Sequence, residues 1–142
     1  MRTSKIFLTV DIVLFKKVSN QLFLLLIKRK NDPFKDCWAL PGGFVDENED
    51  LETAALRELE EETQIKLYQL DQVAAFGKPF RDPRGHMVSV AFTAAVDPST
   101  VAIGSDDAKE AKWFPCNQLP NLAFDHLEII TSCMVKMNIV QL

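Results

Sequence analysis

The order of apolar and polar residues near the start of the chain predicts two consecutive β-strands. In residues 5–17 every second position is aliphatic, which is the two-residue period of a strand. The opposite face is apolar in part, so we expect both sides of this strand to be buried over some of its length. Residues 21–29 are almost entirely apolar, as in a strand covered on both faces. Residues 16–20 lie between the two runs and predict a turn.

A helical period replaces the strand period twice later in the chain. A first helix is expected from Asp50 or Leu51 to Thr63, with Asp50 as its N-cap. A second is expected over residues 125–140, with Asp125 as N-cap and His126 as a packing residue. Between the helices we expect one or two strands in residues 66–80, one at 87–96 and a short one at 110–114. Strands interspersed with helices predict an α/β protein.

Length and composition indicate one ordinary globular domain spanning residues 1–142. Apolar residues make up 47% of the chain and charged residues 25%. The net charge of −4 argues against a general nucleic-acid binder, which would normally present a basic surface. The longest nearly apolar run, residues 21–27, is too short to span a bilayer, so we expect no membrane partner.

Cysteine usage and the N-terminus indicate a cytoplasmic protein. Cys37, Cys116 and Cys133 are odd in number, lie far apart and form no CxxC pair, which argues against a disulfide framework or a zinc site. Free thiols are typical of a reducing compartment. The first residues do not form a signal-peptide pattern with a small-residue cleavage site.

Three glutamates of the first predicted helix share one face. Glu58, Glu61 and Glu62 stand at i, i+3 and i+4, where like charges repel and destabilise a helix. A hard divalent cation such as Mg²⁺ binds oxygen ligands and turns this repulsion into binding. The alternative is a solvated acidic face with an Arg57–Glu61 pair at i, i+4. Taken alone, the three glutamates favour this alternative, because charge runs are usually solvated.

The spacing around these glutamates changes that balance. Five residues separate Gly43 from Glu49, seven more lead to the Arg-Glu pair at 57–58, and the stretch ends at Ile65. It resembles the Nudix box, GX5EX7REUXEEXGU, in which U is aliphatic. Eight of the nine specified positions match: Gly43, Glu49, Arg57, Glu58, Leu59, Glu61, Glu62 and Ile65. The departure is Gln64, where the pattern has glycine; we expect a left-handed conformation there, at a cost of about 1 kcal/mol.

The resemblance implies a fold and a chemistry. The fold is the Nudix α/β/α sandwich with a mixed β-sheet. The chemistry is hydrolysis of a nucleoside diphosphate derivative, with Mg²⁺ or Mn²⁺ as cofactor. The family pattern assigns the metal to Glu58, Glu61, Glu62 and the carbonyl of Gly42, which lies in a Trp-x-Leu-Pro-Gly-Gly run typical of many members. The expected catalytic residues are Glu58 and Glu61, supported by Arg57 and Glu49, with Glu61 acting either as general base or as metal ligand.

A second resemblance concerns the substrate. The run FGKPFRDPRGHMVSVAF is similar to a loop and strand near the substrate of ADP-ribose pyrophosphatases in this family, which implies cleavage of ADP-ribose to AMP and ribose 5-phosphate. We expect Phe80 to stack on a base and Arg81 and Arg84 to hold phosphate or ribose oxygens. A loop salt bridge is an equally favoured alternative for each arginine. Arg29 and Phe44 complete the expected substrate-binding set.

Several polar residues outside the box have a functional and a structural interpretation. The extra carboxylate that Nudix enzymes often use is expected at Asp106, Asp107 or Glu110, although solvated loop acids are the favoured interpretation. Asp11, inside an apolar strand, is interpreted as a hydrogen-bonded structural carboxylate. His86 is interpreted as a structural hydrogen bonder.

Two alternatives to an enzyme stay open. One is a catalytically silent Nudix-like domain that binds ADP-ribose or a related nucleotide as a sensor. The other is a scaffold whose acidic helix is surface only. Family members are often dimers, and the apolar first strand and last helix offer surface for a homodimer.

Overall fold

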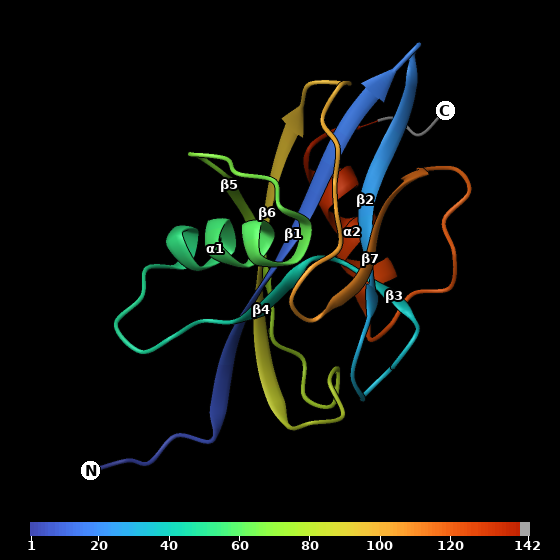
Figure 1. The fold of residues 1–142 in the computed structure, drawn as a ribbon. Coiled ribbons are helices and arrows are strands. Elements are labelled where there is room, and N and C mark those ends of the chain that lie inside the picture. The colour runs from blue at the N-terminus through green and yellow to red at the C-terminus, as the bar shows by residue number, and fades with distance from the viewer. Residues whose placement is uncertain (140–142) are drawn as a thin grey trace.

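The computed structural model describes residues 1–139, in which two helices and seven strands alternate (Figure 1). In chain order the elements are β1 (Ile6–Val18), β2 (Gln21–Arg29), β3 (Trp38–Ala39), β4 (Gly42–Phe44), α1 (Leu51–Thr63), β5 (Asp71–Phe76), β6 (His86–Val96), β7 (Ala108–Pro115) and α2 (His126–Lys136). Neither helix within these residues is long and apolar enough to cross a lipid bilayer.

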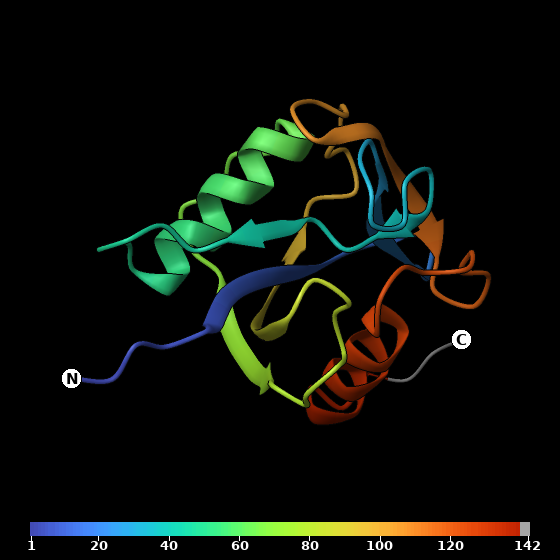
Figure 2. The ribbon, with the colours of Figure 1, turned by 90° about the horizontal axis from the view of Figure 1, so that it is seen from below.

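The strands form one mixed sheet of the order β3-β2-β1-β6-β5, and β4 and β7 pair with β1 and β2. The long β1–β6 pair is parallel, whereas β1 pairs antiparallel with β2 and β4. Helices α1 and α2 cover opposite faces of this sheet (Figure 2). The architecture is therefore the expected α/β/α sandwich with a mixed sheet.

Strand β1 is the centre of the core because both of its faces are covered. Val10, Ile12 and Leu14 are fully buried and belong to the cluster that includes α1. The alternate residues Val13 and Phe15 belong to the cluster that includes α2. Since successive side chains of a strand point to opposite faces, burial on both sides requires an unbroken apolar run. This confirms the burial expected from the sequence.

Helix α1 begins and ends as expected. The carboxylate of Asp50 accepts the backbone N–H of Glu52 at 3.2 Å, which caps the first turn. Gln64 follows the last turn with φ 58° and ψ 21°, and its N–H donates to the carbonyl of Glu60 at 2.9 Å. The position where the Nudix pattern has glycine is thus left-handed in this chain too, with a side chain that disfavours it.

The second half of the chain differs in detail from the prediction. Strand β7 begins at Ala108 because it pairs along the length of β2, not only at the expected residues 110–114. Helix α2 ends at Lys136, before the expected end at Val140, which lies outside the described residues. Asp125 precedes α2, but its side chain makes no capping hydrogen bond and pairs with Arg81 instead.

Candidate active site

A cavity of about 320 Å³ opens between β1, β4 and α1, beside the loops that follow β2 and β5. Its wall combines acidic, basic and aromatic side chains from segments that are far apart in the sequence. They include Asp11, Arg29, Gly42, Gly43, Phe44, Glu58, Glu62, Arg81, Asp82, Arg84, Asp107, Phe124 and His126. Most of the predicted site residues therefore meet at one place.

Glu62 is a carboxylate buried in this cavity, with 5% of its surface exposed. Its Oε1 accepts the backbone N–H of Gly42 at 2.8 Å, which joins α1 to β4. Burial, with smaller contributions from the negative charges of Glu58, Asp107 and Asp11, raises the pKa of Glu62 to about 8. Glu62 therefore keeps its proton at neutral pH unless a positive charge enters the cavity.

Two glycines let the β4 backbone approach the acidic residues closely. A Cβ at Gly43 would lie 2.6 Å from the carboxylate of Glu58, and one at Gly42 would lie 2.1 Å from the carbonyl of Val10. Any side chain at either position would displace the strand or the glutamate. Burial also raises the pKa of Glu58, against the opposing effect of Arg57. Because Gly43 has no side chain, the Glu58 carboxylate has room beside the β4 backbone.

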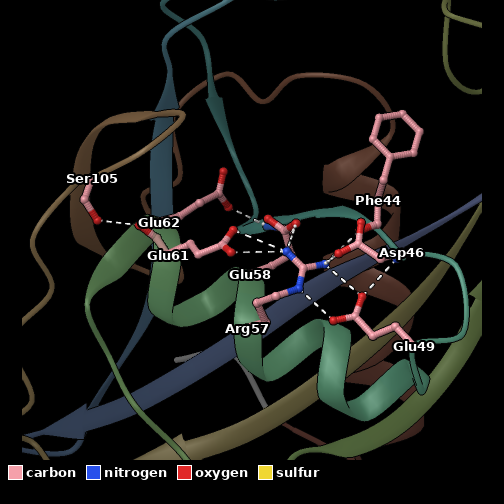
Figure 3. Close-up of polar contacts among 9 residues, drawn as sticks. Phe44, Asp46, Glu49, Arg57, Glu58, Glu61, Glu62 and Ser105 are labelled. Carbon is pink, nitrogen blue, oxygen red and sulfur yellow. Dashed lines mark hydrogen bonds and ion pairs between the residues drawn. The ribbon is translucent and has the colours of Figure 1, made fainter.

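Arg57 donates hydrogen bonds to four carbonyl or carboxylate groups and forms a longer ion pair with Asp46 at 3.5 Å (Figure 3). It contacts Glu49 twice, at 2.7 and 2.9 Å, and its Nη2 donates to the carbonyl of Phe44 at 3.1 Å. Its Nη1 lies 2.9 Å from Glu58 and 3.3 Å from Glu61. The bond to Glu49 is the main cause of a raised pKa at Arg57. The guanidinium of Arg57 therefore lies between the carboxylates of Glu58 and Glu61 on the same helix.

Glu61 is held more loosely than its two neighbours. Its side chain is 41% exposed, and Figure 3 shows it turned toward Arg57. Its backbone is fixed, because the hydroxyl of Ser105 donates to the Glu61 carbonyl and the Ser105 N–H to the Glu62 carbonyl. The Ser105 loop thus binds carbonyls at the end of α1 that have no partner within the helix.

The three acidic residues considered outside the box differ in whether they face the cavity. Asp107 lines the cavity and accepts a hydrogen bond from Asn31 at 3.4 Å. Asp106 acts on Glu58 only through its charge. Glu110 pairs with Lys28 at 3.6 Å and is mostly exposed, away from the cavity wall. Of the three, Asp107 is the one that faces the box glutamates.

The donor atoms at the acidic side of the cavity are oxygens, which suit Mg²⁺ or Mn²⁺ in preference to softer metals. Within residues 1–139 no group of three or more His, Cys, Asp or Glu side chains is arranged to hold an ion as it stands. In Figure 3 Arg57 engages Glu58 and Glu61 together, which compensates part of their charge. The residues thus fit a hard cation in donor type.

The basic side of the cavity brings together three of the residues expected to bind substrate. Arg84 forms a two-point ion pair with Asp82, at 3.1 and 2.7 Å, and lies over the ring of Phe44 at 5.1 Å. Arg29 donates from Nε to the carbonyl of Pro33 at 2.7 Å. Burial, and then the charge of Arg84, lower the pKa of Arg29. Two guanidinium groups therefore lie near each other in the cavity that Glu58 and Glu62 also line.

Arg81 and Phe80 take different positions from these arginines. The side chain of Arg81 is 5% exposed and pairs with both oxygens of Asp125, at 2.7 and 2.8 Å. It lines the cavity, but as part of a buried ion pair instead of an exposed loop salt bridge. Phe80 is 95% exposed and lies outside this cavity. Phe80 lines a second pocket together with Arg81, apart from the cavity that holds Arg29, Phe44 and Arg84.

Asp11 is a hydrogen-bonded carboxylate, as expected, and it belongs to a buried polar chain along the cavity wall that the sequence did not predict. Asp11 accepts the hydroxyl of Ser89 and lies 3.5 Å from Nε2 of His126. The Nδ1 atom of His126 accepts the N–H of Leu40 at 3.0 Å. Burial lowers the pKa of His126, which favours the neutral ring. His126 is thus more than the expected packing residue, since it fixes the turn that leads to Gly42. The one signal in the sequence was a carboxylate in an apolar strand, which needs a partner.

Comparison with known proteins agrees with this geometry. A family model for the NUDIX domain matches residues 5–133. The ADP-ribose pyrophosphatase of Methanocaldococcus jannaschii is 50% identical over 111 residues, which are 78% of this chain and 65% of that protein. The ADPR responsive transcriptional repressor NtrR of Acinetobacter baylyi is 37% identical over 135 residues, or 92% of this chain and 54% of that protein. The chain thus spans less than two thirds of the length of either relative.

Solved structures support the same assignment. The NUDIX domain of Shewanella oneidensis NrtR, solved as a complex with ADP ribose, has a TM-score of 0.86 and 38% identity, covering 95% of this chain and 90% of that one. A MutT/nudix family protein from Enterococcus faecalis has a TM-score of 0.89 and 36% identity, covering 97% and 64%. The box residues, the sandwich around them and these matches lead to one conclusion: the chain belongs to the Nudix family.

Proposed function

We propose that this Nudix domain hydrolyses ADP-ribose to AMP and ribose 5-phosphate with the help of Mg²⁺ or Mn²⁺. The observation that carries the proposal is that carboxylates and guanidinium groups line one cavity. Glu58 and Glu62, whose pKa values are raised, line it together with Arg29 and Arg84. A cation bound to a diphosphate presents a positive charge to the glutamates and negative oxygens to the arginines.

Each box residue then has a defined task. Glu58, Glu62 and the carbonyl of Gly42 would hold the cation, which when bound neutralises phosphate charge and lowers the pKa of water. Arg57, anchored by Glu49, orients Glu58 and Glu61.

We assign the general base to Glu61. It is the most exposed of the three helix glutamates, so its carboxylate is open to water, although it does not itself line the cavity. Water attacks one phosphorus atom, its proton passes to the Glu61 carboxylate, and the bond from that phosphorus to the bridging oxygen breaks. The other phosphate leaves with the bridging oxygen. The products are two monophosphates.

The substrate is the part of the proposal that rests most on relatives. A 50% identical protein is an ADP-ribose pyrophosphatase, and a Nudix domain of the same fold was solved with ADP ribose. The cavity adds aromatic side chains at Phe44 and Phe124, on which a base or ribose can pack.

A sensor is the second candidate function. The observation that favours it is 37% identity to an ADPR responsive repressor over 92% of this chain. The Nudix domain of a repressor need only bind the nucleotide. The intact set of box glutamates supports hydrolysis instead.

We propose a small nucleotide, not nucleic acid, as the partner. Shewanella oneidensis NrtR has also been solved with a 27mer DNA, and this chain spans 61% of that protein. A net charge of −4 does not favour DNA binding by the present chain.

The expected homodimer stays a prediction: Ile6 and Phe7 at the start of β1 are 52% and 53% exposed. Gel filtration with light scattering tests it.

The deciding experiment measures AMP release from ADP-ribose and from a panel of nucleotide sugars and dinucleotides, with Mg²⁺, Mn²⁺ or EDTA. Glu61→Gln and Glu62→Gln should each lower kcat by about 10²- to 10⁴-fold while the protein stays folded. Glu60→Gln is the matched control, because Glu60 lies on the same helix, is exposed and does not line the cavity. Binding of ADP-ribose without turnover would establish the sensor, and the absence of both would refute the proposal.

A further inference from the structure

Phe124 has an unusual backbone for a large residue. Its φ is 53°, in the left-handed region that side chains other than Asn, Asp and Gly rarely adopt. The flanking backbone holds it there: Ala123 donates to the carbonyl of Trp38 at 2.8 Å, and His126 donates to the carbonyl of Ala123 at 3.2 Å. Strain of this kind persists where the surrounding structure imposes it, and it clusters at functional sites.

The ring that this backbone presents contacts both arginines of the cavity. The guanidinium carbon of Arg29 lies 5.0 Å from the ring centre of Phe124, and that of Arg84 lies 5.3 Å away. Phe34 packs against the same ring at 4.7 Å. Two guanidinium groups repel each other, and a shared aromatic face attracts both, which offsets part of the repulsion.

The two arginines differ in how their charge is satisfied. Arg84 is paired with Asp82 at 2.7 Å, as Arg81 is with Asp125. Arg29 is half buried and donates to the carbonyl of Pro33; Glu62, Asp82 and Asp107 act on it through their charge, but no carboxylate in residues 1–139 forms a direct ion pair with it. A guanidinium that is partly withdrawn from water and has no directly bound carboxylate is suited to bind an anion from outside.

We propose that Phe124 is a positioning residue that holds Arg29 and Arg84 together, so that both bind the diphosphate of the substrate. Arg29 supplies the principal contact, because no carboxylate of the described residues forms a direct ion pair with it. Arg84 adds a second contact from the position that Asp82 and Phe44 give it. The pair selects substrates with two adjacent phosphates over those with one. This inference rests on the proposed function and adds the side of the site that binds phosphate.

The test is Phe124→Leu, which keeps an apolar side chain of similar length and removes the aromatic face. KM for ADP-ribose should rise about tenfold while kcat stays within about twofold, since two cation–π contacts are lost. Phe124→Tyr should restore KM because it keeps the ring. Phe114→Leu is the matched control: Phe114 is also partly buried and lies 5.2 Å from the ammonium of Lys112, but it is outside the cavity.

A double-mutant cycle separates positioning from packing. In an Arg29→Met background, Phe124→Leu should change KM by only about threefold, because the ring then positions Arg84 alone. The dissociation constant of α,β-methylene ADP-ribose with Mg²⁺ should follow the same pattern. This dissociation constant can be measured even if the wild-type chain binds without turnover, or if a variant is inactive.

The outcomes distinguish this inference from the proposed function. If the wild-type chain neither binds nor cleaves ADP-ribose, the proposed function fails. If it does, but Phe124→Leu leaves KM unchanged, or changes KM equally with and without Arg29, Phe124 does not position the arginines. If Phe124→Leu does not fold, the Arg29→Met and Phe124→Tyr variants decide: tenfold weaker binding in the first and wild-type binding in the second are expected, and wild-type binding by Arg29→Met overturns the inference.

Discussion

Glu62→Gln tests whether buried negative charge destabilises the protein when no metal is present. Glu62 is 5% exposed, and its Oε1 accepts the N–H of Gly42. Burial, together with the charge of Glu58, raises its pKa from 4.5 to about 8. A glutamine at this position keeps an acceptor for the Gly42 N–H and carries no charge at any pH.

The magnitude follows from the two pKa values. The unfolded chain releases the proton near pH 4.5, and the folded protein keeps it until about pH 8. The folded state therefore binds more protons over this interval, and stability falls as pH rises from 4.5 to 8. At 1.36 kcal/mol per pKa unit the full effect is about 5 kcal/mol, of which about 3 kcal/mol is lost by pH 7. The Glu62→Gln variant lacks this loss.

The assay is urea unfolding of the metal-free protein in EDTA at several values from pH 5 to pH 8. The free energy of unfolding of the wild type should fall by about 3 kcal/mol relative to Glu62→Gln across this range. Glu60→Gln should follow the wild type, because Glu60 is exposed on the same helix. Adding Mg²⁺ at pH 8 should stabilise the wild type and leave Glu62→Gln nearly unchanged. Parallel pH profiles of the wild type and Glu62→Gln would refute the reasoning.

Three further substitutions test other parts of the fold. Gln64→Gly should raise the melting temperature by about 3 °C, because it removes a left-handed cost of about 1 kcal/mol; a lower melting temperature would show that the glutamine side chain has a specific role. His126→Leu should destabilise by about 1–3 kcal/mol and speed amide exchange at Leu40, because the N–H of Leu40 loses its acceptor; His126→Asn, which offers an oxygen, should recover part of the protection. Asp125→Ala should cost about 3–5 kcal/mol, because it leaves Arg81 buried without its partner; urea midpoints equal to the wild type would contradict that interpretation of the pair.

The parts of the site that follow from short sequence separations were predictable. The helix, its N-cap and the left-handed position after it depend on residues within one or two turns of each other. The contact of Arg57 with Glu49 spans eight residues and comes from one helix and the loop before it. Residues that are close in the sequence are then also close in the structure. The sequence pattern of the box was therefore enough to predict these contacts.

The parts that depend on long-range packing were not predictable. Phe124, Asp125 and His126 are adjacent in the sequence, yet their partners come from β2, from the loop before β6 and from the turn before β4. Nothing local in the run indicates that its three side chains contact three different walls of one cavity. Phe80 shows the converse: its neighbours in the sequence line the cavity, but a loop with φ 70° at Phe80 turns that ring outward.

The position of Arg57 explains how a helix with clustered glutamates folds before a metal binds. Glu58 and Glu61 would destabilise α1 by mutual repulsion, but Nη1 of Arg57 contacts both. Glu49 holds the guanidinium in place with two further bonds, so this compensation is built from the protein alone. Arg57 does not contact Glu62, which instead has a pKa raised to about 8 and so keeps its proton at neutral pH while no cation is bound. A chelator should therefore leave the chain folded, unlike a structural zinc domain, and remove only the chemistry at the cavity.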